Sequence, residues 1–92
     1  MSRRRRYRVE LAPAPARQLR RLPPGDASRG RAAILALAIA PRPPGVARVT
    51  GSEYWRIRVG ELRVIYLVDD DAAMVVILKV ARRGESTYRR VG

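Results

Sequence analysis

The 92-residue sequence contains no cysteine and no histidine. Without cysteine the chain cannot form a disulfide, a zinc finger or a thiol nucleophile. Without histidine it has neither imidazole acid–base catalysis nor a serine–histidine triad. No apolar run approaches the length of a membrane span, and no secretory apolar segment follows the basic N-terminus. These absences predict a cytoplasmic protein with no membrane partner.

Acidic residues and lysine are also scarce. Eight Asp and Glu residues stand against twenty Lys and Arg, which leaves a formal net charge of +12, and Lys79 is the only lysine. An excess of this sign indicates an anionic partner, with nucleic acid ahead of an acidic protein or an anionic membrane surface. The planar, permanently charged guanidinium group suits phosphate. A GC-rich genome would also supply many arginines, so their placement is more informative than their number.

The run Asp69-Asp70-Asp71 is the densest acidic group in the sequence. Successive carboxylates between two strand patterns are typical of a solvated turn, and we assign them no chemistry. Neither a metal site nor another cofactor is predicted.

A chain of this length is expected to form one domain, residues 1–92, in which 1–6 are a disordered basic tail. The spacing of apolar residues predicts a strand at 7–11, helices at 16–22 and 26–40, and strands at 54–59, 62–68 and 74–80. Asp26 or Ser28 is expected to cap the second helix, and the nearly all-apolar last strand is expected to be central and buried on both faces. The predicted fold is α+β in the order β-α-α-β-β-β, with a small antiparallel sheet packed by an N-terminal helical hairpin.

Gly60-Glu61 separates two strand patterns and indicates a two-residue hairpin with a type II′ turn. In that register Arg58 lies directly opposite Arg63. Because side chains alternate between the faces of a strand, Arg56, Arg58 and Arg63 share one face. The opposite face is expected to enter the core through Trp55, Ile57, Val59, Leu62, Val64 and Tyr66.

Arg58 facing Arg63 is a local conflict, because like charges directly opposite each other destabilise a strand pair. A local rule that is broken without an evident gain in folding indicates a functional site. A bound phosphate would relieve the repulsion, since it matches the guanidinium fork. The alternative is a solvated basic face in an arginine-rich protein.

A second basic group ends the last predicted strand. Arg83 would share a face with Lys79, Arg82 precedes it, and Tyr88 follows after a turn. A basic patch beside a tyrosine suits RNA, because aromatic rings stack on unpaired bases. We therefore predict that Lys79, Arg82 and Arg83 contact RNA. Tyr88 could also be an ordinary packing residue.

The stretch GSEYWRIRVGELRVIY, from Gly51 through Tyr66, is followed by the aspartate turn, by VVILKVARR and by a final tyrosine. This arrangement resembles the RelE/ParE toxin superfamily over nearly the whole chain. The resemblance implies a small antiparallel sheet with two helices, close to the microbial ribonuclease architecture. It also implies an endoribonuclease that cleaves messenger RNA in the ribosomal A site, with the 2′-hydroxyl of the RNA as nucleophile and without a metal. A cognate antitoxin would hold the toxin inactive.

The resemblance carries over to individual positions. Arg56 and Arg58 match two basic residues of the family, often lysines, on the strand before the hairpin. Arg63 matches the arginine after the hairpin, Arg83 the arginine that closes the last strand, and Tyr88 the C-terminal tyrosine. These five form the expected catalytic set, and Arg82 stands where related toxins often have histidine. Arginine stays protonated in proteins, so Arg58 cannot readily replace a lysine as general base, and Tyr88 is the best remaining base.

Two alternatives stay open. One is a ParE-like protein that inhibits DNA gyrase, although ParE-like proteins lack the basic residues and tyrosine of the ribonuclease branch. The other is a basic module that binds RNA or an acidic antitoxin without catalysis. If the chain is a RelE-like endoribonuclease, as we favour, its expected partners are the antitoxin, the ribosome and messenger RNA. Leu35 and Ile39 widen the apolar stripe of the second helix, which indicates either a contact with the antitoxin or a broad core contact.

Overall fold

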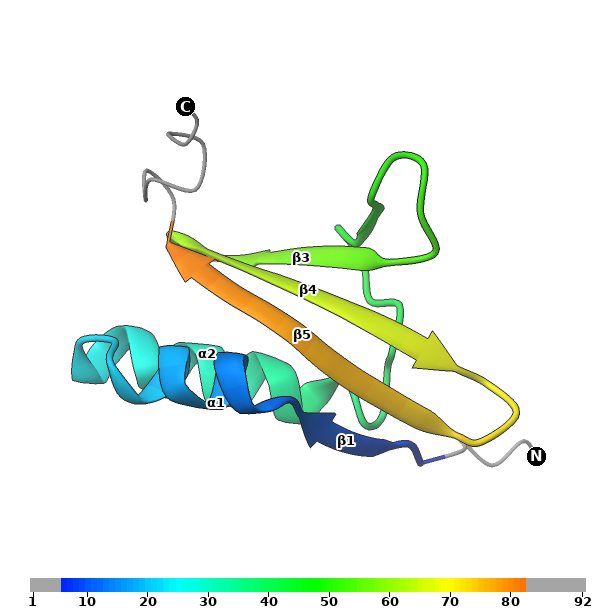
Figure 1. The fold of residues 1–92 in the computed structure, drawn as a ribbon, viewed down its shortest axis with the longest axis horizontal. Helices are drawn as coiled ribbons and strands as arrows, with labels where there is room; N and C mark the ends of the chain where they lie inside the picture. The colour runs from blue at the N-terminus through cyan, green and yellow to red at the C-terminus, as the bar shows by residue number, and fades with distance from the viewer. Residues whose placement is uncertain (1–5, 83–92) are drawn as a thin grey trace.

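The computed structural model describes residues 6–82. Within this range the chain forms strands and helices in an order that Figure 1 traces: β1 (Arg8–Leu11), α1 (Pro13–Arg20), α2 (Pro24–Ala36), β2 (Ala47–Arg48), β3 (Trp55–Val59), β4 (Leu62–Asp69) and β5 (Met74–Arg82). The predicted α+β class and element order are confirmed, with β2 as an addition. No helix in this part of the chain is long and apolar enough to cross a membrane.

The described strands form one sheet in the order β1-β5-β4-β3-β2. The pairs β3–β4 and β4–β5 are antiparallel as predicted, and the additional pair β2–β3 is antiparallel too. Strand β1, in contrast, lies parallel to β5. The expectation of an antiparallel sheet is therefore wrong for β1. Alternation of apolar and polar residues predicts a strand but not its direction. A parallel pair needs a long connection between its two strands, and here the helices and strands β2–β4 connect β1 to β5.

Strand β2 is too short for sequence periodicity to show. It consists of Ala47 and Arg48, which pair with Arg56 and Trp55 of β3. The Val49 N–H continues this pairing by donating to the Tyr54 carbonyl at 2.9 Å. The segment after the proline–glycine linker thus becomes the sheet edge next to β3.

The helices begin and end at proline-rich boundaries. Helix α1 begins at Pro13, earlier than predicted, because Pro13 and Pro15 fit a first helical turn, where a missing N–H costs nothing. Helix α2 begins at Pro24, and among the described residues no side chain caps it, so the expected capping role of Asp26 or Ser28 is wrong. After Ala36 the chain continues to Ile39 in tighter turns with N–H groups bonded three residues back, which shortens the predicted helix.

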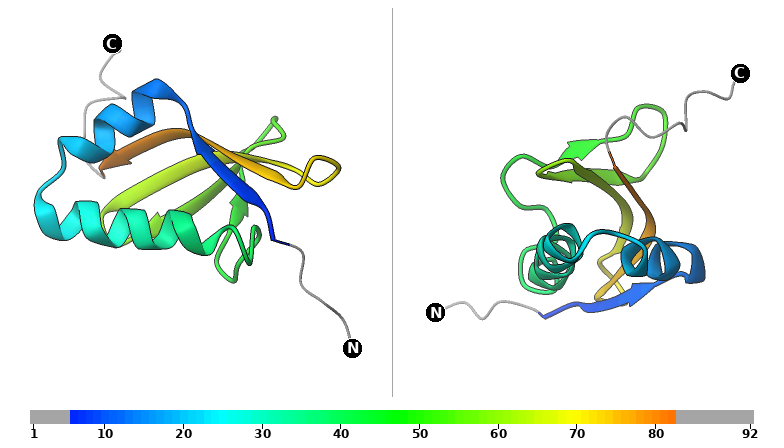
Figure 2. Two further views of the ribbon diagram at one scale, coloured as in Figure 1. Left: turned by 90° about the horizontal axis from the view of Figure 1, so that it is seen from below. Right: turned by 90° about the vertical axis from the view of Figure 1, so that its left-hand side faces the viewer.

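Both helices lie on the same face of the sheet (Figure 2), and the core lies between the helices and that face. Its most deeply buried apolar residues come from β4, β5 and the end of α2: Leu62, Val64, Tyr66, Val75, Ile77 and Leu37. Gly30 allows α2 to approach closely, because a Cβ there would lie 3.2 Å from side-chain atoms of both Leu19 and Leu62. The predicted core face of the hairpin is confirmed at Ile57, Leu62, Val64 and Tyr66.

The opposite face of the sheet has no helix over it in the described part of the chain, and β5 shows the consequence. Val75, Ile77 and Val80 are buried beneath the helices, whereas Val76 and Leu78 remain half-buried and Lys79 is exposed. Burial of this strand on both faces is therefore not observed. A register shift beside Ile65 and Tyr66 adds Leu78 as an extra residue in β5, which turns Lys79 to the uncovered face.

Tyr66 of β4 connects the sheet to the proline-rich linker through a hydrogen bond. Its side chain has no exposed surface, and its hydroxyl donates to the Pro41 carbonyl at 2.7 Å. Burial raises the pKa of Tyr66 to about 12 from the ordinary value of 10.0, and the nearby positive charge of Arg42 opposes part of this rise.

This raised pKa predicts a loss of stability at high pH. The folded state holds the Tyr66 proton more tightly than the unfolded state, so its contribution is fully present below pH 10.0 and is lost as the pH rises through about 12. In urea unfolding, Tyr66→Phe should cost about 1 kcal/mol near neutral pH through the lost hydrogen bond. The variant should also lack the part of the decrease in unfolding free energy at high pH that comes from ionisation of Tyr66. An equally steep decline in both proteins between pH 10.0 and about 12 would contradict this.

Candidate functional site

The predicted hairpin register is confirmed. Val59 pairs with Leu62, Arg58 with Arg63 and Ile57 with Val64. Gly60 has a φ of +59°, and Ala73 is the only non-glycine residue between 6 and 82 with a positive φ. A positive φ at the first loop residue alone fits the predicted type II′ turn.

Four basic side chains lie on the uncovered face of the sheet: Arg56, Arg58, Arg63 and Lys79. We call this group the arginine face. Arg58 pairs with Arg63 and Arg63 with Ala81, while Arg56 pairs with Ile65 and Ile65 with Lys79. The pairing therefore places two basic residues in each of two adjacent rows across β3, β4 and β5. This arrangement confirms the predicted common face of the three arginines and adds Lys79 to it.

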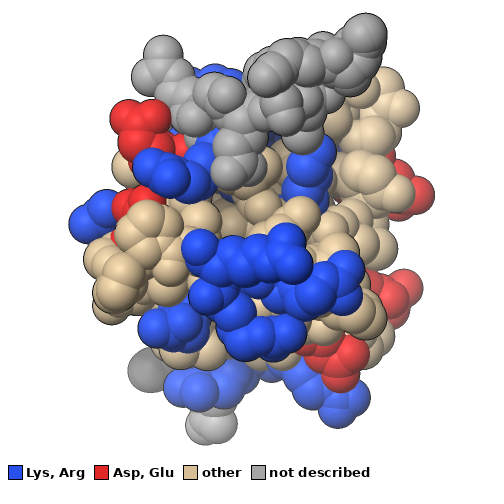
Figure 3. Space-filling view, turned by 60° about the vertical axis from the view of Figure 1, so that its left-hand side comes forward, with Lys and Arg blue, Asp and Glu red and all other residues tan. Residues whose placement is uncertain are grey.

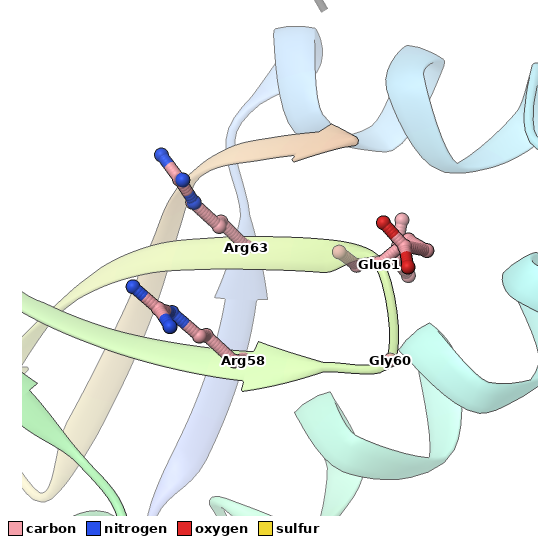
Figure 4. Close-up of a pocket in the computed structure, with 5 residues that line it drawn as sticks. Arg58, Gly60, Glu61 and Arg63 are labelled. Atoms are coloured by element: carbon pink, nitrogen blue, oxygen red, sulfur yellow. The ribbon is translucent and has the colours of Figure 1, made fainter. Parts of the chain in front are cut away.

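Arg58 and Arg63 extend side by side from neighbouring strands, away from the hairpin turn (Figure 4). They line a pocket at this end of the sheet together with Gly60, Glu61 and Leu62. Glu61 contributes a carboxylate to the lining, but Figure 4 shows that it points away from the two guanidinium groups. The part of the pocket beside the arginines is therefore suited to an anion.

Arg82 does not join the arginine face. It pairs with Leu62, whose side chain is buried beneath the helices, so Arg82 lies on the helix side of the sheet. There its Nε lies 3.6 Å from Oδ2 of Asp26, whose Oδ1 lies 2.6 Å from Arg29. The contact of Arg82 with RNA stays a prediction, and the structure places this side chain apart from the arginine face. Arg83 and Tyr88 lie outside the described residues.

A second cluster, which sequence reasoning missed, lies at the other end of β3. The guanidinium groups of Arg42 and Arg48 lie 5.4 Å and 4.8 Å from the centre of the Trp55 ring. Arg42 also forms an ion pair with Asp70 at 2.7 Å, and Asp70 accepts a hydrogen bond from Tyr7. The hydrogen bond with Asp70 raises the pKa of Arg42.

This cluster has a structural role that revises the interpretation of the aspartate turn. Asp70 joins residues from the N-terminus, the linker and the β4–β5 turn, and Asp69 accepts a hydrogen bond from the Ala72 N–H. Two of the three aspartates therefore stabilise the turn and its neighbours instead of being simply solvated. The sequence gives no spacing signal for contacts between residues so far apart in the chain.

Basic side chains are not confined to the uncovered face of the sheet. Exposed arginines of the helices and their connection include Arg17, Arg20, Arg21 and Arg31. Figure 3, which turns the helical end of the molecule forward, shows basic groups gathered on this side as well. Net charge alone therefore does not single out the arginine face, whereas the paired strand positions do.

Arg58→Gln is expected to raise the free energy of unfolding by about 0.2–1 kcal/mol at low salt, because it removes one of two like charges that face each other. The gain should shrink as salt screens the repulsion. Arg8→Gln is the matched control, since Arg8 lies in β1 and forms a 3.3 Å ion pair with Glu10. Urea unfolding at two salt concentrations measures both variants. A loss of stability in Arg58→Gln would show that its charge supports the fold.

The fold and the arginine face define a small α+β protein with a basic sheet face, and comparisons with known proteins give its family. The model of the ParE toxin of type II toxin–antitoxin systems, parDE, matches residues 3–87. A protein of Methanocaldococcus jannaschii described as "Putative toxin RelE1" is 32% identical over 88 residues, which cover 91% of this chain and 97% of the relative. The chain belongs to the RelE/ParE superfamily of type II toxins, as the sequence resemblance indicated.

Solved structures agree with this family. The archaeal RelE–RelB complex of Pyrococcus horikoshii OT3 contains a chain that is 29% identical, with a TM-score of 0.76 over 86% of this chain and 97% of that one. The toxin–antitoxin complex RelBE2 of Mycobacterium tuberculosis contains one that is 26% identical, with a TM-score of 0.67 over 87% and 94%. The chain is thus a toxin of the RelE type by relationship and by fold.

Proposed function

We propose that this toxin is a ribosome-dependent endoribonuclease that cleaves messenger RNA in the A site and so inhibits translation. The observation that carries the proposal is the pair Arg58 and Arg63, held directly opposite each other on an uncovered sheet face. Like charges that face each other across a strand pair oppose folding, and a phosphodiester bound between them would offset that repulsion. The RelE names of the archaeal relatives support the same branch of the superfamily.

The proposed reaction is a transesterification within the RNA. The 2′-oxygen gives up its proton and bonds to phosphorus, the bond from phosphorus to the 5′-oxygen breaks, and that oxygen takes up a proton. The products end in a 2′,3′-cyclic phosphate and a 5′-hydroxyl, and neither a metal nor another cofactor is needed. Arg56, Arg63 and Arg83 stabilise the dianionic phosphorane, because fixed positive groups act strongly where charge develops.

The remaining roles follow from the chemistry of the side chains. Lys79, in the row of Arg56, contacts the RNA backbone. Arg58 binds phosphate, since a guanidinium stays protonated and cannot accept the 2′-hydroxyl proton. Tyr88 is the proposed base, because a phenolate can accept a proton whereas a guanidinium cannot. Arg83→Ala and Tyr88→Phe should therefore both relieve growth arrest when the toxin is expressed without its antitoxin.

We also propose that a cognate antitoxin binds the helical side of the molecule. Leu35 and Ile39 are 66% and 47% exposed, and Leu11 of β1 is exposed nearby. A groove lined by Leu11, Leu19, Arg31, Ile34 and Leu35 runs between β1, α1 and α2. An apolar groove with a basic rim suits an amphipathic acidic segment. The antitoxins present in the related RelE structures make this occupant the natural one.

The matching family model is named after the ParE toxin, so the competing function is the ParE-like one, inhibition of DNA gyrase. Primer extension on messenger RNA after induction separates the two functions. The proposal expects cleavage sites confined to translated messages, whereas intact messages with altered supercoiling and induced DNA repair would indicate gyrase. A non-catalytic RNA-binding module would show salt-dependent RNA affinity but no cyclic-phosphate product.

A further inference from the structure

Tyr54 extends the uncovered face of the sheet beyond the arginine face. It lies one residue before β3, and its carbonyl accepts a hydrogen bond from the Val49 N–H at 2.9 Å, so the strand pairing reaches it. Because side chains alternate along a strand, Tyr54 lies on the same face as Arg56 and Arg58. Its side chain is among the exposed large hydrophobic groups, with 40% of its surface accessible.

The surroundings of Tyr54 are apolar. The β3–β4 pairing ends at Trp55 and Tyr66, and its continuation by one step would bring Tyr54 opposite Leu67. Leu67 itself pairs with Val76. Leu67, Val76 and Ile65 are half-buried on this face, where no element between residues 6 and 82 covers them. The uncovered face therefore has a basic end near the hairpin turn and an apolar, aromatic end near Tyr54.

This gradient matches the chemistry of a single strand of RNA, which has an anionic backbone and flat apolar bases. We propose that Tyr54 stacks on an unpaired base of the same RNA whose phosphate lies between Arg58 and Arg63. The inference rests on the proposed function and adds a base-binding position to it. An aromatic ring stacks on any base, so Tyr54 contributes affinity and register more than sequence preference.

The spacing separates the two contacts along the RNA. Four residues along a strand span about 13 Å. Successive nucleotides in a helical strand are about 3.4 Å apart. The base at Tyr54 therefore belongs to a different nucleotide from the one whose phosphate is held at Arg58. Cleavage chemistry and base stacking thus occur at different nucleotides, and loss of the ring should weaken binding without changing the products.

The test is fluorescence anisotropy of the full chain with a labelled unpaired RNA oligonucleotide, at several salt concentrations. Tyr54→Ala should weaken binding about 5-fold to 100-fold, because one stacked base contributes about that much. Tyr54→Phe, which keeps the ring, should bind like the natural protein, and Tyr54→Leu, which is apolar without a π face, should not. The slope of the logarithm of the binding constant against the logarithm of the salt concentration should be unchanged in Tyr54→Ala. In Arg58→Gln, which loses one phosphate contact, its magnitude should fall by about 0.7.

An oligonucleotide with abasic sugars distinguishes stacking from a structural effect. The natural protein should bind it more weakly than ordinary RNA, and Tyr54→Ala should lose nothing further on it. Equal losses on both oligonucleotides would overturn the inference, as would unchanged affinity of Tyr54→Ala for ordinary RNA. Unchanged RNA affinity with weaker binding of the co-expressed antitoxin would assign this face to protein. If the natural protein binds no free RNA, the inference is overturned, whereas the proposed function is judged separately by cleavage on ribosomes.

Discussion

Arg63→Ala is expected to lower the rate of messenger RNA cleavage by about 100-fold to 1,000-fold, the effect of removing one preorganised donor from a developing oxyanion. Arg63 lies on β4, between β3 and β5, and is less exposed than Arg58, so the sheet fixes its position. Its guanidinium shares the lining of the pocket with that of Arg58. A phosphate there would accept hydrogen bonds from two strands at once.

The measurement is single-turnover cleavage on ribosomes programmed with a defined message. Arg63→Lys should fall between the natural protein and Arg63→Ala, since it keeps the charge but loses the planar fork. Urea unfolding of both variants checks that the fold survives, so that a slower cleavage can be assigned to the site. Undiminished cleavage by a folded Arg63→Ala protein would remove Arg63 from the site.

Leu37→Ala is expected to lower the free energy of unfolding by about 2–5 kcal/mol, because it leaves a cavity in the core. Leu37 caps the C-terminal end of α2 and is 1% exposed. A loss of this size is a large part of the stability of a domain as small as this one. Denaturant unfolding should show a lower midpoint with an unchanged slope.

Leu35→Ala is the matched control two residues away. Leu35 is 66% exposed, so its truncation should change stability by less than about 0.5 kcal/mol. It should instead weaken binding of the antitoxin, measured by titration of the purified pair. If Leu35→Ala destabilised the fold as much as Leu37→Ala, the proposed antitoxin surface would be part of the core.

The sequence predicted the hairpin well because several signals agree there. The Gly-Glu pair determines the turn, the turn determines the register, and alternation assigns each side chain to a face. The pairs Arg58–Arg63 and Ile57–Val64 and the core positions Leu62, Val64 and Tyr66 all follow. The candidate site was accessible from sequence because it lies on this one hairpin.

Features that depend on distant segments were less predictable. The direction of β1 is determined by its place beside β5, which a strand pattern does not encode. The side of the sheet on which Arg82 lies depends on its pairing with Leu62, and basic character alone does not reveal that. The cluster of Arg42, Trp55 and Asp70 requires the linker, β3 and the β4–β5 turn to meet.

We propose above all that the paired arginines of the hairpin hold the phosphate of a message that this toxin cleaves. The most direct measurement is the chemistry of the RNA ends produced on translating ribosomes by the natural protein and by the double variant Arg58→Gln, Arg63→Ala. We predict a 2′,3′-cyclic phosphate on the upstream fragment with the natural protein and an intact message with the double variant. An intact message with the natural protein, or the same cyclic-phosphate product from both proteins, would contradict the claim.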